Sequence, residues 1–216
     1  MQTVPILVYG SGGFGREVAW LAEECSVGQT RYPVCAFVDD DDSTHGVDVN
    51  EIPVMGWDAA TRAFPDARMI AAVGSPQVRA GIVARSAWAA SRLVHPSVLH
   101  SRFVEIGEGT VICARTVLTT NIVLGRHVQI NLSCTIGHDV VMGDYSTLAP
   151  GAHISGWVHM GARVYVGTGA VILPGTPGAP LVIGDDAVIG AGAVVRASVE
   201  PGTTMVGVPA KPTRAR

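Results

Sequence analysis

The sequence predicts an α/β N-terminal domain, a Rossmann-like half domain, followed by a left-handed parallel β-helix of hexapeptide repeats. The first observation is an aliphatic residue at every sixth position of the second part. The unbroken series is Ile106, Ile112, Leu118, Leu124, Ile130, Ile136, Met142, Leu148, Ile154, Met160, Val166 and Ile172. A period of six fits neither a helix nor a simple strand. It is typical of the hexapeptide β-helix, in which three hexads close a triangular coil of 18 residues.

The second observation is how this series begins and where it slips. Val94 starts it, and His100 is its only polar member. After Ile172 the series resumes eleven residues later at Ile183, and Ile189 and Val195 follow. Five extra residues must therefore loop out within the Gly- and Pro-rich segment 174–180. This loop either covers bound CoA or is a surface insertion without a role in binding, and we favour the surface insertion.

Glycine directly follows the aliphatic residue in eight repeats, at positions 107, 125, 137, 143, 161, 167, 184 and 190. The aliphatic side chain is expected to point into the prism. We expect the glycine after it to relax the backbone at the corner of the coil. Successive coils should stack at the strand spacing of about 4.8 Å.

The third observation is that the first 92 residues lack the period of six. Short apolar runs alternate there with segments of helical spacing, which predicts a parallel sheet with helices on its faces. The expected strands are 4–10, 34–38, 52–55 and 68–73, and the expected helices are 16–25, 58–64 and 76–89, the last opened by Pro76. The predicted domains are therefore 1–92 and 93–216, the second ending in a C-terminal tail.

A glycine-rich turn joins the first strand to the first helix. Gly10-x-Gly12-x-x-Gly15 is the arrangement that lets backbone N–H groups and a helix N-terminus approach a diphosphate. Asp39 follows the second strand, where a carboxylate can accept hydrogen bonds from a ribose or a base. A domain of half the usual length lacks the second mononucleotide half that NAD requires. A nucleotide-linked small molecule is the favoured ligand, ahead of a purely structural turn.

Composition narrows the classes of partner. The formal net charge is −3, which gives no general argument for nucleic acid or an anionic membrane. The four cysteines form no CxxC motif and are expected to be reduced thiols. The longest N-terminal apolar run is too short for a signal peptide or a membrane span. We expect a cytoplasmic protein.

Several motifs in their order resemble one family. GSGGFGREV, FVDDD, AVGSP, the repeats containing Ile136-Gly-His138-Asp139, and Val206-Gly-Val-Pro-Ala-Lys211 are similar to the hexapeptide-repeat sugar O- and N-acetyltransferases. Within that family the nucleotide-linked aminosugar N-acetyltransferases are the nearest resemblance, of the GDP-perosamine, dTDP-viosamine or UDP-bacillosamine-precursor type. The resemblance implies a homotrimer that binds acetyl-CoA between neighbouring β-helices and the nucleotide sugar in the N-terminal domain. It also implies a histidine base.

The transfer of an acetyl group to an amine needs a base, a placed nucleophile and a donor to the oxyanion. Among the histidines of the repeats, only His138 is followed by an acid, Asp139, which can fix its tautomer. The resemblance assigns the base to His138, the orienting acid to Asp139 and an active-site amide to Asn131. In an 18-residue coil Gly156 lies beneath His138, so its N–H is the candidate oxyanion donor.

The resemblance also indicates which residues bind the substrate and which bind the cofactor. The expected substrate-binding residues are Gly12, Gly13, Phe14, Asp39, Asp40, Gly74 and Ser75. The expected cofactor-binding residues are Thr147, Gly156, Thr168 and Lys211. Thr147 and Phe14 stand where bacillosamine-type enzymes carry histidines, which leaves the identity of the sugar open. CoA is anionic, and the local cations near the C-terminus are Arg163, Arg196, Lys211, Arg214 and Arg216.

The favoured function is acetylation of the 4-amino group of a nucleotide-linked 4-amino-4,6-dideoxy sugar, without a metal. Transfer to a hydroxyl group, as in sialic acid O-acetyltransferases, would use the same base. A zinc hydratase needs three histidine ligands, and His153 and His159 are expected to point apart. A non-catalytic β-helix protein that binds a nucleotide sugar is the alternative of a different class.

Overall fold

The computed structural model describes residues 2–213. Its contacts divide the chain into two units. The first extends to Gly74 and continues over 78–96, and the second comprises 75–77 and 97–216. Each unit is described by itself.

The first unit is built on a sheet with the strand order β5-β6-β4-β2-β7. Every neighbouring pair is parallel except β5 with β6. The bounds are β2 (Ile6–Tyr9), β4 (Val34–Val38), β5 (Asp48–Val49), β6 (Ile52–Met55) and β7 (Arg68–Ala71). Two short strands, β1 (Gln2–Thr3) and β3 (Thr30–Arg31), pair separately. The central strand β2 is buried along its whole length.

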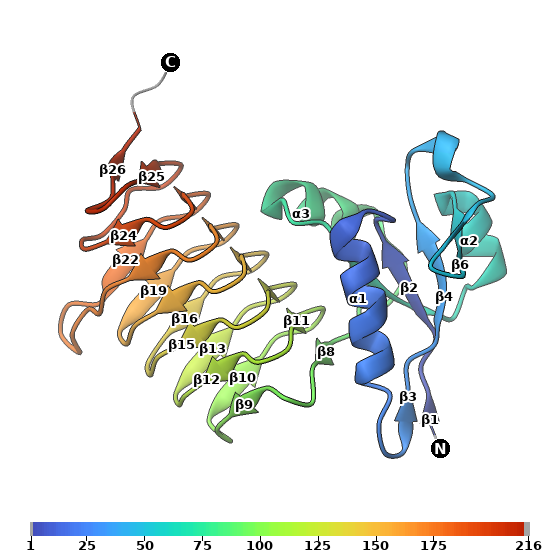
Figure 1. The fold of residues 1–216 in the computed structure, drawn as a ribbon, viewed down its shortest axis with the longest axis horizontal. Helices are drawn as coiled ribbons and strands as arrows, with labels where there is room; N and C mark the ends of the chain where they lie inside the picture. Colours follow the sequence, from blue (N-terminus) through green and yellow to red (C-terminus); the bar gives the residue numbers. More distant parts are fainter. Residues whose placement is uncertain (1, 214–216) are drawn as a thin grey trace. The chain divides into compact units, whose positions relative to one another are not determined.

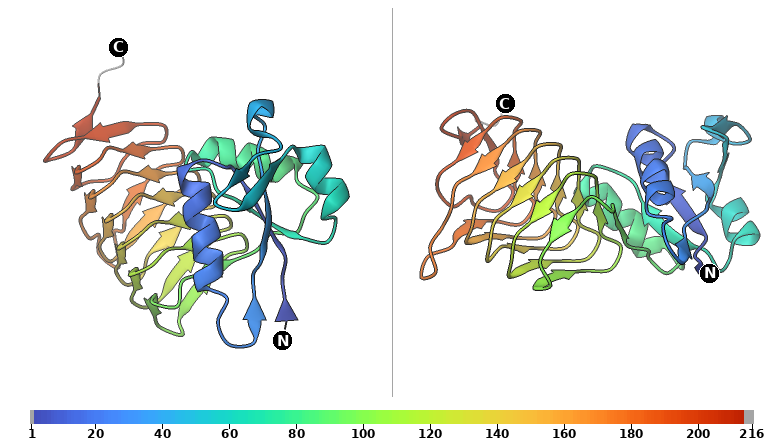
Figure 2. Two further views of the ribbon diagram at one scale, coloured as in Figure 1. Left: turned by 45° about the vertical axis from the view of Figure 1, so that its right-hand side comes forward. Right: turned by 60° about the horizontal axis from the view of Figure 1, so that its bottom comes forward.

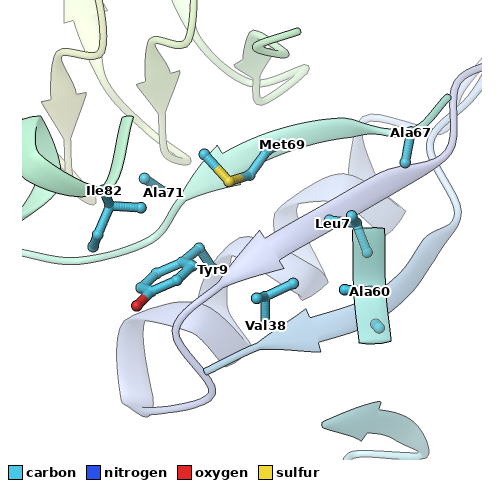
Figure 3. Close-up of a cluster of buried hydrophobic side chains, with 9 residues drawn as sticks. Leu7, Tyr9, Val38, Ala60, Ala67, Met69, Ala71 and Ile82 are labelled. Carbon is cyan, nitrogen blue, oxygen red and sulfur yellow. The ribbon is translucent and has the colours of Figure 1, made fainter. Parts of the chain in front are cut away.

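Helices cover both faces of this sheet (Figures 1 and 2). They are α1 (Gly13–Glu24), α2 (Trp57–Ala63) and α3 (Pro76–Arg85), with one 3₁₀ turn, η1 (Asp42–Thr44). On one face Leu7, Val38 and Met69 pack with Ala60 of α2 and Ile82 of α3 (Figure 3). The continuous burial of β2 is what a sheet covered on both faces requires.

Two helix boundaries differ from the prediction by three residues or more. The first helix begins inside the glycine-rich turn at Gly13, three residues early, because the helical N–H of Arg16 already bonds to the carbonyl of Gly12. The last helix stops at Arg85 instead of 89. Met69 of β7 bonds through its N–H to the carbonyl of Ala89, so the chain there extends the sheet edge and cannot be helical.

The second unit is a left-handed parallel β-helix whose coils stack along one axis (Figure 1). Its first face contains β9 (Leu99–His100), β12 (Val117–Leu118), β15 (Thr135–Ile136), β18 (His153–Ile154), β21 (Val171–Ile172) and β24 (Val194–Val195). Its second face contains β10 (Val104–Ile106), β13 (Ile122–Leu124), β16 (Val141–Met142), β19 (Val158–Met160) and β22 (Leu181–Ile183). Its third face contains β11 (Val111–Ile112), β14 (Gln129–Ile130), β17 (Thr147–Leu148), β20 (Tyr165–Val166), β23 (Val188–Ile189), β25 (Thr204–Val206) and β26 (Lys211–Pro212). Strand β8 (Leu93–Val94) precedes the first coil.

The strand register confirms the predicted coil of 18 residues. Val117 pairs with Thr135, and Thr135 pairs with His153 one coil later. The aliphatic residues from Ile112 to Val195 at the predicted six-residue positions are buried. After the Gly- and Pro-rich segment His159 pairs with Val182, 23 residues on. The five extra residues therefore do leave the coil, and the register is restored by Ile183.

The expected role of the repeat glycines is wrong. None of the eight glycines after the aliphatic residues has a positive φ. The left-handed corner residues stand two positions later and are mostly not glycine: Arg115, Asn121, His127, Ser133, Asp139, Tyr145, Trp157, Arg163 and Asp186. A Cβ on Gly143 would instead lie 2.6 Å from the backbone nitrogen of Ala162. These glycines are needed because successive coils approach too closely for a side chain, whatever the torsion angle.

This explanation predicts that Gly143→Ala destabilises the β-helix by overpacking, at a cost of about 1–3 kcal/mol. The thermal midpoint should fall by roughly 2–4 °C per kcal/mol in a chain of this size. Gly151→Asn is the control, since Gly151 has φ +67° and open space around it, and asparagine tolerates that torsion. Equal midpoints for the two variants would contradict the explanation.

Candidate active site

The loops that follow β2, β4 and β7 lie at the same edge of the first unit's sheet. Because the chain passes from β2 to β4 on one side and β7 lies on the other, the strand order switches at β2. Ligands of open α/β sheets bind in the crevice at such a switch point. The predicted substrate-binding residues fall in these three loops.

The glycines of the first loop have different roles. Gly10 has φ +101°, and a Cβ on Gly15 would overlap the carbonyl oxygen of Gly10, so these two glycines let helix and strand meet. A Cβ on Gly12 would have no neighbour within 4 Å, and one on Gly13 would have only the end of Arg16, at 4.0 Å. The surface of Gly12 and Gly13, beside the N-terminus of α1, is therefore open to a ligand. Phe14 is half-buried in the first turn of α1.

Asp39 holds the glycine-rich loop. Its Oδ2 accepts hydrogen bonds from the backbone N–H of Ser11 at 2.9 Å and from its hydroxyl at 2.6 Å. Burial opposes ionisation of Asp39, but the hydrogen bonds from Ser11 and the following backbone outweigh it, so the pKa of Asp39 is lowered. The carboxylate is thus ionised and fixed beside the loop, and Ser11 is a site residue that the sequence analysis did not identify.

Asp40 has a different partner. It accepts hydrogen bonds from Arg85 at 2.6 and 2.7 Å, and the same guanidinium donates to the Tyr9 hydroxyl at 2.7 Å. The guanidinium carbon of Arg85 also lies 4.5 Å from the ring centre of Trp57. The hydroxyl of Tyr9 and the guanidinium of Arg85 lower the pKa of the Asp40 carboxyl, while burial and Asp40 raise that of Tyr9. The sequence analysis identified neither Arg85 nor Trp57.

Asp39 and Asp40 also line a pocket of 640 Å³ within the first unit. Its wall is formed by the loop after β4, the end of β6 and the start of α2, and includes His45, Trp57 and Arg62. His45 is held by a contact of 2.9 Å between its Nε2 and the carbonyl oxygen of Asp39. The mixture of carboxylates, an imidazole and an indole suits a heteroaromatic ligand with polar edges.

The third loop contains Gly74 and Ser75, both exposed. It is fixed from below by Arg79, whose side chain is only 1% exposed and donates to the carbonyl of Val73 at 2.6 Å. A buried arginine that holds a backbone turn cannot be recognised from a single sequence.

The β-helix contributes an imidazole paired with a carboxylate. Nδ1 of His138 lies 2.7 Å from Oδ2 of Asp139 at the first corner, between the first and second faces. The side chain of Asp139 is 24% exposed and that of His138 is 54% exposed. Because Asp139 occupies Nδ1, the other nitrogen, Nε2, is left to meet a substrate.

The coil beneath this pair leaves room for the ring. A Cβ on Gly156 would lie 2.7 Å from Nε2 of His138, so only glycine allows the imidazole this position. Within the described part of the chain the N–H of Gly156 donates to no backbone carbonyl. Trp157 packs edge to face with His138, with the ring centres 6.2 Å apart. The structure thus brings His138, Asp139 and Gly156 together, and adds Trp157, which the sequence analysis did not identify.

The other predicted residues of the β-helix lie elsewhere in the same chain. Asn131 is at the third corner, between the third and first faces, and its amide donates to the carbonyl of Leu148 at 2.8 Å. Thr168 is exposed at that same corner. Thr147 begins β17 on the third face, which is the face opposite the first corner. One chain alone therefore brings Gly156 to the predicted base, but not Thr168, and not Thr147, which is only 2% exposed.

The expected cations are also separated. Lys211 is exposed in β26, and Arg196 is exposed after β24. Arg163 is engaged in a bidentate pair with Asp186, with both distances 2.7 Å, so it is less available to a phosphate than predicted. Arg214 and Arg216 lie outside the described residues.

The looped-out segment leaves the coil at the first corner. The N–H of Gly175 bonds to the carbonyl of Gly156, and that of Leu181 bonds to the carbonyl of Trp157. The segment therefore departs one coil beyond Gly156, on the same corner as His138. The segment thus protrudes from the corner of the prism that carries His138, and its role stays a prediction.

Over residues 2–213 no three side chains among His, Cys, Asp and Glu lie close enough together to hold a metal ion. His153 and His159 lie on different faces, and Nδ1 of His153 contacts the hydroxyl of Thr135 at 2.8 Å. Nor does any helix among these residues have the length and apolar character to cross a bilayer.

Comparisons with known proteins agree with this architecture. Residues 5–86 match the family model of the PglD N-terminal domain. The chain is 32% identical over 155 residues to a GDP-perosamine N-acetyltransferase of Escherichia coli O157:H7, covering 70% of each protein. It is 36% identical to the structure of WeeI from Acinetobacter baumannii AYE, with a TM-score of 0.87 and coverage of 98% of this chain and 100% of that one. A perosamine N-acetyltransferase from Caulobacter crescentus, solved as a histidine-to-asparagine mutant with CoA and GDP-perosamine, is 27% identical with a TM-score of 0.87, covering 98% of this chain and 97% of that one.

A half Rossmann-like domain joined to a left-handed β-helix with a histidine–aspartate pair at its corner defines a hexapeptide-repeat acyltransferase. This chain belongs to the family of aminosugar N-acetyltransferases that contains the GDP-perosamine enzyme.

Proposed function

We propose that this protein transfers the acetyl group of acetyl-CoA to the 4-amino group of a nucleotide-linked 4-amino-4,6-dideoxy sugar. The observation that carries the proposal is the His138–Asp139 pair, with the unoccupied Nε2 of the imidazole above Gly156. Within this family such a pair is suited to removing a proton from an attacking amine.

In the proposed reaction the neutral amine attacks the thioester carbonyl carbon and forms the C–N bond. Nε2 of His138 accepts the proton that the nitrogen loses, and Asp139 stabilises the resulting imidazolium. The oxyanion of the tetrahedral adduct accepts a hydrogen bond from the N–H of Gly156. The C–S bond then breaks, and the imidazolium returns the proton to the leaving thiolate, so that CoA and the acetylated sugar are the products.

We propose that the nucleotide lies at the switch point of the first unit. The diphosphate would meet the open backbone of Gly12 and Gly13 at the N-terminus of α1, with Gly74 of the loop after β7 at the same edge of the sheet. The base and ribose would occupy the pocket lined by Asp39 and Asp40. Guanine is the favoured base because its N–H groups suit a carboxylate-lined wall, and because the relatives named above include enzymes of GDP-perosamine.

We propose a homotrimer with three shared sites. His138 lies at the first corner, whereas Thr168 lies exposed at the third corner of the same prism, and Thr147 on the third face is buried. A CoA molecule that touches both His138 and Thr168 must therefore lie between two chains, and threefold closure provides three such grooves. Asn131 and Lys211 would approach the site from the neighbouring chain. We further propose that the enzyme acts in the cytoplasm, where acetyl-CoA and nucleotide sugars are made.

A hydroxyl acceptor is the second candidate, because the same imidazole could deprotonate it. The decisive experiment supplies GDP-, dTDP- and UDP-linked 4-amino-4,6-dideoxy sugars, and the matching 4-hydroxy sugars, with acetyl-CoA. Release of free thiol should occur with an amino sugar and be fastest with the GDP form. Turnover of the hydroxy sugars alone would replace N-acetylation with O-acetylation.

The position of the nucleotide sugar is tested by Gly13→Val. Because the surroundings of Gly13 are open, the fold should persist, and the added side chain should stand where the diphosphate approaches. The KM for the sugar nucleotide should rise at least tenfold, while the KM for acetyl-CoA should change less than twofold. Equal changes in both constants would show that this loop does not serve the sugar nucleotide alone.

His138→Ala should lower kcat by about 10²–10⁴, the usual contribution of a general base. Asp139→Asn should cost less, and should move the acidic limb of the kcat/KM profile to lower pH, since it removes a charge that favours imidazolium. CoA affinity, measured by calorimetry, should hardly change in either variant. Near-normal turnover of His138→Ala at all pH values would exclude His138 as the base and direct attention to His153 and His159.

The shared site predicts the oligomeric state. Light scattering at micromolar concentration should give three times the chain mass of 22.4 kDa. A fully active monomer would contradict the arrangement in which one groove is formed by two chains.

A further inference from the structure

The pair of His138 and Asp139 has a third member, which belongs to the coil before it. The amide Nδ2 of Asn121 lies 3.2 Å from Oδ1 of Asp139, and Oδ2 of the same carboxylate lies 2.7 Å from Nδ1 of His138. We propose that Asn121 is a positioning residue that acts on the base through Asp139. The proposal rests on the acetyl transfer proposed above.

The direction of this hydrogen bond follows from charge. An asparagine amide has a carbonyl end and an NH₂ end, and only the NH₂ end can face an ionised carboxylate without repulsion. The Thr120 hydroxyl lies 3.5 Å from the side-chain Oδ1 of Asn121, at the limit of a hydrogen bond, so the amide oxygen has a donor of its own. The amide therefore donates to Oδ1 of Asp139.

The backbone of the three residues is rigid. The N–H of Asp139 bonds to the carbonyl of Thr120 one coil before, and the N–H of Trp157 bonds to the carbonyl of His138. Side chains on such rungs can rotate, but their anchoring atoms cannot shift. The carboxylate of Asp139 can still rotate about its own bonds. The hydrogen bonds of its two oxygens, one to Asn121 and one to His138, fix the plane of the carboxylate.

This matters to the base because an imidazole can exist as two neutral tautomers. With Oδ2 held toward Nδ1, the proton stays on Nδ1, and Nε2 keeps the lone pair that accepts the proton of the amine. Without Asn121 the carboxylate can turn away from the ring, and a larger share of the histidine then presents the wrong nitrogen. A hydrogen-bonded partner of this kind orients a residue that does chemistry, as an outer partner orients a metal ligand.

A competing explanation is purely conformational. Asn121 has φ +55°, and asparagine is among the few residues that accept this torsion easily. The substitution that separates the two roles is Asn121→Gly, since glycine accepts the torsion and lacks the amide. Ser133→Gly is the matched control for stability, because Ser133 has φ +59° at another corner and an exposed side chain.

The experiment is a double-mutant cycle with Asn121→Gly and Asp139→Gly, both at left-handed positions. Asn121→Gly alone should lower kcat by about 3- to 30-fold, within the coupling that residues in direct contact show. KM for both substrates should stay within twofold. In the Asp139→Gly background the same substitution should change kcat by less than about twofold, because the residue through which Asn121 acts is gone. The thermal midpoints of Asn121→Gly and Ser133→Gly should be alike.

A second variant reports on charge. Asn121→Asp keeps the shape and the torsion but places an anion beside Asp139. It should move the acidic limb of kcat/KM to higher pH, since another negative charge favours imidazolium. This is opposite to the shift expected for Asp139→Asn. Among the described residues, the carboxylate of Asp139, the ring of Trp157 and the backbone of Gly156 face the imidazole, and Asn121 is reached through the carboxylate.

Three outcomes would overturn the proposal. An unchanged kcat in Asn121→Gly would mean that the amide has no part in the reaction. An equal loss of kcat with and without Asp139 would mean that Asn121 acts on substrate directly. A fall in thermal midpoint much larger than that of Ser133→Gly, with no shift of the pH profile in Asn121→Asp, would mean a conformational role only. Absence of acetyl transfer by the unaltered enzyme would be a failure of the proposed function instead.

Discussion

Backbone hydrogen bonds between successive coils determine where every functional atom of the β-helix lies. The N–H of Thr119 bonds to Ile136, that of Gly137 bonds to Ile154, and that of Ser155 bonds to Ile172, always one coil on. These bonds bring the coils so close that a side chain is excluded at the repeat glycines. The same spacing allows an amide, a carboxylate and an imidazole on neighbouring rungs to reach one another. Stability and site geometry therefore have one cause.

The first unit achieves a comparable placement with a parallel sheet. Its strands end at one edge, so loops far apart in sequence meet there. Asp39 and Asp40 are adjacent in the chain and chemically identical, yet one holds the backbone of Ser11 and the other holds Arg85. Alternation along the extended chain sends the two carboxylates to different partners. The short turn that contains Asp39 and Asp40 thereby holds both the glycine-rich loop and the guanidinium of Arg85, which stacks on Trp57.

Much of this molecule can be predicted from its sequence because its periods are long and regular. The aliphatic residue at each sixth position predicts the coil and its register, and the strand at 34–38 agrees with the structure at both ends. The pair of His138 and Asp139 is adjacent in the chain, so its contact needs no knowledge of the fold. The relation of Gly156 to His138 follows from the coil length alone.

What could not be predicted depends on side-chain reach or on local torsion. The glycines of the repeats and the left-handed corners have the same period, and only coordinates separate close approach from positive φ. Arg85 acts across the sheet on Tyr9 and Asp40, and Arg79 reaches back to the turn before its own helix; neither contact follows from a spacing rule. Asn121 lies one coil of 18 residues before Asp139. Asparagine is common at such corners, however, so the contact of its amide with Asp139 is evident only from the structure. The helix end at Arg85 is decided by pairing of the next segment with β7, which is a tertiary effect.

The segment between Gly175 and Leu181 shows how this architecture tolerates changes of length. Thr176 and Ala179 exchange two backbone hydrogen bonds of 3.0 Å, so the protruding residues satisfy one another, and the next strand resumes its place on the second face. An insertion at a corner therefore leaves the β-helix unchanged, because the strands before and after it keep their register. New surface can be added at the corner that carries the proposed base, His138, without disturbing the histidine itself. In a scaffold of stacked coils, longer corner loops can therefore change which acceptor an enzyme binds, while the residues that carry out the reaction keep their positions.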